Sequence, residues 1–282
     1  MLSSAPSSIG SKAAALRARV ATIEILVPEL LDAVRQGGRD FDDAALRIAR
    51  KLLLADRIAI VDSGFEAAVL SLFGMNDDGQ SMPPLAGVTA AFDFNLDALP
   101  ADLLRADPVH LRADPSRVIM FDADIVGLDA DEADALLELL NQSFTNDGIA
   151  FKRGRSPLRW YVSVPNAAAT TTRSPRALRG QAIEPFLDDV RRAGTLNRLM
   201  TEIQMLLYEA PINTARESAG KLPINSVWFW GFGPLPERPS PSLTAVFGQD
   251  DLVAACARFC GVEHYRVLDV NSAASLGSEG SV

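Results

Sequence analysis

Apolar residues in the first part of the chain follow a helical pattern and then a strand pattern. Between residues 11 and 36 they recur at spacings of three or four, which predicts a helix. A second helix is predicted over residues 41–55. The apolar run Ile58–Val61 predicts a buried strand, and Asp62-Ser63-Gly64 closes it before a further helix that ends near Gly74.

The middle of the chain alternates between strand and helix patterns. Residues 88–94 predict a weak strand. Val109–Arg112 and Val118–Phe121 flank Asp114-Pro115-Ser116, which predicts a hairpin with a short turn. Asp129 is a favourable N-cap for the next helix, because a glutamate three residues later completes a capping box.

The last part of the chain carries three helix patterns interleaved with strands. The predicted helices are residues 195–208, 213–219 and 249–260, and the predicted strands are Trp160–Val164, Ile224–Trp230 and Tyr265–Leu268.

Strands and helices alternate at both ends of the chain, whereas the middle contains the hairpin. This order predicts an α/β protein with a mostly parallel sheet and flanking helices, interrupted by a smaller α+β insertion that contains the hairpin. The predicted core is discontinuous, formed by residues 11–94 and 195–270, and the insertion is 95–194. Residues 1–10 and 271–282 are predicted to be disordered tails.

Charge and composition narrow the choice of partners. The formal net charge is −9 and the pI about 4.8, so neither nucleic acid nor an anionic membrane surface is an expected partner. No apolar run reaches the roughly 18 residues of a membrane span, and the N-terminus lacks a secretory pattern. We expect a cytoplasmic protein in which Cys256 and Cys260 are reduced thiols.

Most familiar catalytic patterns are missing from the sequence. It contains two histidines, His110 and His264, which are too few for the usual zinc or two-metal sites. There is no phosphate-binding P-loop, and Gly231-Phe232-Gly233 is a lone glycine pair at a strand end. The acidic residues between 122 and 134 lack EF-hand spacing and favour a solvated helix start. We predict no catalytic residue, no metal and no cofactor.

Six stretches, in order, carry a resemblance to known proteins: Arg105–Arg112, Leu139–Phe144, Asp147-Gly148, Arg159–Tyr161, Glu202–Leu207 and Pro211–Gly231. Together they resemble a bacterial family of RpfE-type regulatory or phosphoglycerate-mutase-like proteins, over residues 45–237. The last stretch also resembles the middle of archaeal-type cofactor-independent phosphoglycerate mutases, of the alkaline-phosphatase superfamily. The resemblance implies a shortened relative of these enzymes.

The departures from that family concern its metal chemistry. The full enzymes carry an N-terminal aspartate and a nucleophilic serine for a metal pair, and later Asp/His-rich motifs with no counterpart in this sequence. A histidine of the family falls where this chain has Glu209 or Ala210. A mutase without its metals lacks charge neutralisation and an activated nucleophile. The resemblance therefore implies a retained scaffold without the metal chemistry.

Polar residues of the matched stretches are candidates for binding a small anion. Polar groups near strand ends often line ligand crevices, and Arg216 could hold a carboxylate or phosphate with two hydrogen bonds. The alternative is that these side chains cap backbone groups and pair with nearby carboxylates. The candidates are Asn213, Arg216, Asn225, Ser226, Glu202, Gln204, His110, Arg112 and Arg159.

Three functional hypotheses follow. The first is a non-catalytic binding or regulatory protein on a degenerate mutase-like scaffold, with a small anionic metabolite or a protein as partner. The second is a metal-dependent phosphoglycerate mutase or phosphatase-type hydrolase, with a carboxylate-only Mg²⁺ site using Asp62 and Ser63. The third is an interaction scaffold in which the helix of residues 11–36 packs against a partner or a second copy.

Overall fold

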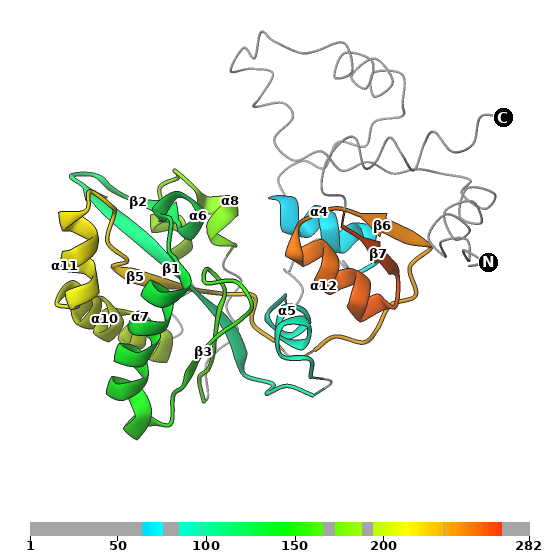
Figure 1. Ribbon diagram of the computed structural model, residues 1–282, viewed down its shortest axis with the longest axis horizontal. Coiled ribbons are helices and arrows are strands. Elements are labelled where there is room, and N and C mark those ends of the chain that lie inside the picture. The colour runs from blue at the N-terminus through cyan, green and yellow to red at the C-terminus, as the bar shows by residue number, and fades with distance from the viewer. Residues whose placement is uncertain are drawn as a thin grey trace, which may run out of the picture. The chain divides into compact units, whose positions relative to one another are not determined.

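The computed structural model describes residues 64–75, 85–96, 98–165, 173–187, 194–233 and 235–266 (Figure 1). The predicted helices at 11–36 and 41–55, the strand Ile58–Val61, the pair Asp62 and Ser63, and both tails lie outside these residues. Apart from the first part of α4, the elements below belong to one compact unit, Leu70–Leu268.

A long central strand organises the main sheet. The sheet has five strands: β1 (Leu103–Asp114), β2 (Arg117–Asp122), β3 (Phe151–Arg153), β4 (Trp160–Ser163) and β5 (Ser226–Trp230). The predicted hairpin is confirmed, because β1 and β2 pair antiparallel from Asp114 opposite Arg117 outwards.

The register shows how three strands share β1. Arg105 pairs with Tyr161 of β4 and also with Trp230 of β5, and Val109 likewise pairs with one residue of β2 and one of β5. A strand has only two edges, so β5 lies along one edge of β1 while β4 and β2 follow each other along the other.

The prediction of a mostly parallel sheet is wrong. All four pairings of the main sheet are antiparallel, and the parallel pair among the described residues is the separate two-stranded sheet of β6 (Ala245–Phe247) and β7 (Glu263–Tyr265). A parallel neighbour needs a crossover that returns the chain to the same end of the sheet. Here three of the described helices lie between β4 and β5 in the chain, and both strands pair with β1 instead of with each other.

Most helix predictions agree with the structure. The helices are α4 (Gly64–Leu72), α5 (Leu85–Phe94), α6 (Ala123–Val126), α7 (Ala130–Phe144), a 3₁₀ turn (Thr145–Asp147), α8 (Pro175–Leu178), α10 (Thr195–Tyr208), α11 (Pro211–Ser218) and α12 (Asp251–Cys260). The capping box of Asp129 and Glu132 at the start of α7 is confirmed. None of the described helices is both long and apolar enough to cross a membrane.

The predicted strand at residues 88–94 is wrong, because this segment lies in helix α5. Residues Leu85 to Ala90 are all buried, so no polar face marks the helical period. The N–H of Ala86 donates to the carbonyl of Gly231 at 3.0 Å, which ties the helix to the end of β5. Gly231 has φ 64°, and a Cβ there would lie 3.2 Å from the Ala86 nitrogen, so the contact requires glycine.

A buried ion pair lies at the centre of the sheet. The Asp107 carboxylate accepts two hydrogen bonds from Arg105, at 2.9 and 2.6 Å, one from the Trp160 backbone N–H at 3.2 Å and one from the Trp230 indole at 2.8 Å. The Arg105 guanidinium also stacks 4.8 Å from the Trp230 ring and 5.5 Å from the Tyr161 ring. Burial raises the pKa of Asp107, and the ion pair with Arg105 opposes that shift.

We expect Asp107→Asn to lower the free energy of unfolding by about 3–5 kcal/mol, since it leaves Arg105 as an unpaired buried charge and turns an amide toward donors. Asp114→Asn, on the same strand, is the matched control. Its carboxylate is exposed and pairs Arg117 at 3.4 Å, so its loss should cost less than about 1 kcal/mol. Chemical denaturation measures both, and equal small losses would contradict the central role of Asp107.

Candidate functional site

Asn213 joins the helical segment to the sheet. Its amide nitrogen donates to the carbonyls of Leu207 and Ile224, at 2.8 and 2.7 Å, and its amide oxygen accepts from the Ile224 N–H at 2.9 Å. The side chain is buried, and these three bonds hold the end of α10 against the chain entering β5.

The side chains at the start of β5 extend the sheet pairing. The Asn225 amide accepts from the Leu111 N–H at 2.8 Å and donates to the Leu111 carbonyl at 2.9 Å, as a backbone group in a ladder would. Gln204 on α10 donates to the buried Ser226 hydroxyl at 3.1 Å. His110 Nδ1 lies 2.9 Å from the Pro223 carbonyl, to which it donates.

Arg216 is almost completely buried and bonds to several carbonyls. It donates to Leu222 at 3.0 Å and to Val126 at 2.7 Å, and it pairs with the Glu132 carboxylate. The same carboxylate caps α7, because it accepts from the Asp129 N–H at 3.2 Å. Arg216 thus links α11 to the start of α7, and the partner among the carboxylates is Glu132.

The remaining candidates do not join this group. Glu202 is half-buried on α10 and pairs with Arg198 at 2.7 Å. Arg112 is exposed and stacks 4.8 Å from the Phe121 ring. The structure therefore places Asn213, Gln204, Asn225, Ser226 and His110 around the start of β5, while Arg159 belongs to another network.

Arg159 precedes β4 and binds a completely buried carboxylate of α5. Its guanidinium holds both oxygens of Asp93 at 2.6 Å, and the Tyr161 hydroxyl donates to Asp93 at 2.7 Å. Burial raises the pKa of Tyr161, which keeps this hydroxyl protonated as a donor. Gly154 leaves the required room, because a Cβ there would lie 2.0 Å from a carboxylate oxygen of Asp93.

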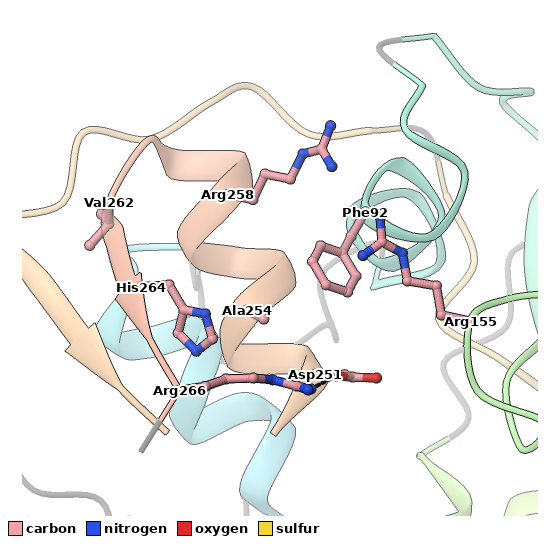
Figure 2. A pocket seen from close by; sticks show the side chains of 8 residues that line it. All are labelled: Phe92, Arg155, Asp251, Ala254, Arg258, Val262, His264 and Arg266. Carbon is pink, nitrogen blue, oxygen red and sulfur yellow. Dashed lines mark hydrogen bonds and ion pairs between the residues drawn. The ribbon is translucent and has the colours of Figure 1, made fainter. Parts of the chain in front are cut away.

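A cavity of about 600 Å³ lies beside this network, between α5, α12 and the residues that surround β7 (Figure 2). Its polar lining consists of Arg155, Arg258, Arg266, His264 and Asp251, and its apolar lining of Phe92, Ala254 and Val262. The size falls within the range of small-molecule sites. Three arginines from separate segments of the chain converge on this cavity.

Each of the three arginines forms its hydrogen bonds to the described residues through a single guanidinium nitrogen. Arg155 Nε lies 3.5 Å from the Asp93 carbonyl, and its guanidinium stacks 4.4 Å from the Phe92 ring. Arg258 donates through Nη2 to the Asn95 side chain. Arg266 donates through Nη2 to Asp251 at 2.7 Å and to the Gln249 carbonyl at 3.5 Å. Toward the described residues, the other guanidinium nitrogens make no hydrogen bond, so they are available to an anion.

Asp251 is the carboxylate of the pocket and is shared between two arginines. One oxygen accepts from Arg266 at 2.7 Å, and the other accepts from Arg159 at 3.2 Å. Asp251 therefore connects the cavity to the buried Asp93 network through Arg159. Figure 2 shows its bond from Arg266 on the cavity side.

The arginine-lined pocket is absent from the predicted site. Arg155 lies about a hundred residues before Arg258 and Arg266, so no local spacing marks the three as a group. One signal was present, because His264 and Arg266 alternate along a strand-like segment, and a period of two places them on the same side.

No cluster of three or more His, Cys, Asp or Glu side chains that could hold a metal occurs within the described ranges. The acidic residues around α6 and α7 have other partners, as Arg179 holds Asp122 and Asp124, and Arg153 holds Asp134. Asp62 and Ser63, the residues of the carboxylate-only hypothesis, lie outside the described residues.

Comparison with known proteins identifies mutase-like relatives. The chain is 27% identical over 229 residues to a probable 2,3-bisphosphoglycerate-independent phosphoglycerate mutase of Geobacter sulfurreducens, covering 78% of this chain and 56% of that protein. It is 29% identical over 111 residues to such a mutase of Methanosarcina barkeri, covering 39% of this chain and 28% of that protein. In sequence the chain is thus phosphoglycerate-mutase-like, and it spans about half or less of the length of these curated relatives.

A scan against models of protein families finds no match. Among solved structures, the cofactor-independent phosphoglycerate mutase of Thermoplasma acidophilum aligns with 17% identity and a TM-score of 0.37, covering 76% of this chain and 61% of that one. A TM-score this low does not establish a shared fold.

Replacing Arg216 tests its structural role. We expect Arg216→Lys to lower the free energy of unfolding by about 2–4 kcal/mol, because an ammonium group cannot reach all the carbonyls that the guanidinium bonds. Denaturation of Arg198→Lys, which alters an exposed ion pair, serves as the control. A variant as stable as the wild type would show that the buried contacts of Arg216 contribute little.

His110 should make stability depend on pH. Burial and nearby Arg112 lower its pKa, against the opposing effects of Pro223 and Glu217, so the unfolded chain binds a proton more readily than the folded one. Stability should fall as pH drops below about 6.5, by at most about 1.4 kcal/mol per pH unit, and this contribution should be absent in His110→Gln. Parallel slopes for both proteins between pH 7 and 5 would contradict the assignment.

Proposed function

We propose that this protein is a non-catalytic binding or regulatory protein that holds a small oxyanion, such as a phosphorylated metabolite, in the arginine-lined pocket. The observation that supports this most directly is the convergence of Arg155, Arg258 and Arg266 on one cavity, each with guanidinium nitrogens left available. Arginine forks match phosphate and carboxylate geometry and bind these groups with charge-assisted hydrogen bonds.

The charge of the pocket opposes that of the chain. Three guanidinium groups and one carboxylate leave a net positive charge of two in the cavity, with His264 neutral. The whole chain carries −9. A local positive cavity on an acidic protein attracts small anions, whereas the surrounding negative charge repels polyanions such as nucleic acid. The pocket therefore favours a compact ligand with one or two anionic groups.

The similarity to phosphoglycerate mutases supports a phosphorylated ligand, since those relatives are named for a phosphorylated substrate. A regulatory role, and the narrower relationship to bacterial RpfE-type proteins, form part of this proposal. The same similarity also favours the alternative, a metal-dependent mutase or phosphatase using Asp62 and Ser63. Turnover of a phosphate ester that Asp62→Ala abolishes would decide for the alternative.

We expect sulfate and inorganic phosphate to raise the melting temperature in a saturable way at constant ionic strength, because a bound anion stabilises the folded state. Arg266→Gln and Arg258→Gln should each weaken this binding about tenfold, since each removes a charge-assisted bond.

Arg117→Gln is the control, because this arginine is exposed, lies outside the pocket and, among the described residues, pairs with Asp114 on the hairpin. The proposal fails if the pocket variants respond to both anions as the control does.

A further inference from the structure

Asp251 is bonded to Nη2 of Arg266, the guanidinium nitrogen that takes part in any two-point contact with an anion. We propose that this carboxylate is a built-in competitor of the pocket, which holds down its affinity and is displaced from Arg266 when an oxyanion binds. The inference rests on the proposed anion-binding function and assigns to Asp251 the role of setting the affinity of that site.

The geometry provides Asp251 with two partners. Its contact with Arg266, at 2.7 Å, lies on the cavity side, and its contact with Arg159, at 3.2 Å, leads to the buried Asp93 network. An anion that binds Arg266 through two nitrogens uses Nη2 and competes with the first contact, whereas the second contact remains available to Asp251. After displacement from Arg266, Asp251 still has Arg159 as a cationic partner. The free-energy cost of the rearrangement is therefore small, because no buried charge is left unpaired.

The negative charge of Asp251 repels any anion in the cavity. It is the only carboxylate lining the described pocket, whose other charged groups are three arginines. A carboxylate on the same chain is always close to Arg266, so a ligand from solution competes with a partner of high effective concentration. Repulsion grows with ligand charge, so a dianion is penalised more than a monoanion of the same shape.

Asp250 offers a control for the test. It is the neighbouring residue, with a side-chain exposure of 37% against 31% for Asp251, and it pairs with Arg176 instead of lining the pocket. It also caps α12 by accepting from the Leu252 N–H at 2.8 Å, and asparagine preserves such a cap. Asp250→Asn and Asp251→Asn therefore remove the same charge from adjacent positions.

The experiment measures dissociation constants of sulfate and methyl sulfate for the full chain, by thermal-shift titration at constant ionic strength. Both probes have a tetrahedral sulfur bound to four oxygens, but sulfate carries a charge of −2 and methyl sulfate, in which one oxygen is methylated, a charge of −1. We expect Asp251→Asn to bind sulfate about tenfold more tightly than the wild type, because the variant lacks one competing charge-assisted bond. The increase in affinity for methyl sulfate should be smaller. Asp250→Asn should change either constant less than about twofold, because its charge lies outside the cavity.

Weaker or unchanged sulfate binding in Asp251→Asn would overturn the inference, since Asp251 would then position Arg266 for the ligand or play no part. If this variant does not fold, Asp251→Ser is measured in its place under the same criterion. The proposed function is judged separately by Arg266→Gln. If Arg266→Gln loses sulfate binding but Asp251→Asn does not bind sulfate more tightly, the competitor role of Asp251 is rejected and the proposed anion site is retained.

Discussion

The sheet depends on one buried carboxylate, that of Asp107. A charge in the interior is tolerated only when it is paired and its lone pairs are satisfied. Here Arg105 supplies the counter-charge, while Trp160 and Trp230 bring one donor each from β4 and β5. The carboxylate therefore holds both edges of β1 at one point, and the register that pairs Arg105 with residues on both neighbours follows the same arrangement.

A second buried carboxylate, Asp93, applies the same principle on α5. Its carboxylate accepts hydrogen bonds from Arg159 and Tyr161, which lie just before and within β4. Gly154 has no side chain to block the Asp93 carboxylate. Arg159 extends from this centre to Asp251 at the start of α12. The pocket therefore borders a polar network, and α5, β4 and α12 are positioned by ion pairs as well as by apolar packing.

Residues of the mutase-like stretches at the start of β5 are bonded mainly to the protein itself. Asn213 and Asn225 substitute for backbone groups, and Arg216 gathers carbonyls around the start of α7. These bonds give the side chains a structural role in the scaffold. The arginines that line the proposed anion site, Arg155, Arg258 and Arg266, lie outside these stretches. The mutase-like stretches and the proposed site thus occupy different parts of the described structure.

The sequence alone determined the local elements whose signals are local: the capping box of α7, the bounds of α10, and the hairpin of β1 and β2. It did not reveal α5 as a helix, because the first six residues of this helix are all buried and leave no polar stripe to mark the period. Strand direction and the partners of Asp107 were decided by tertiary structure, since the order of elements does not specify which edges meet. The arginine pocket likewise required the fold, because only three-dimensional packing brings Arg155 beside Arg258 and Arg266.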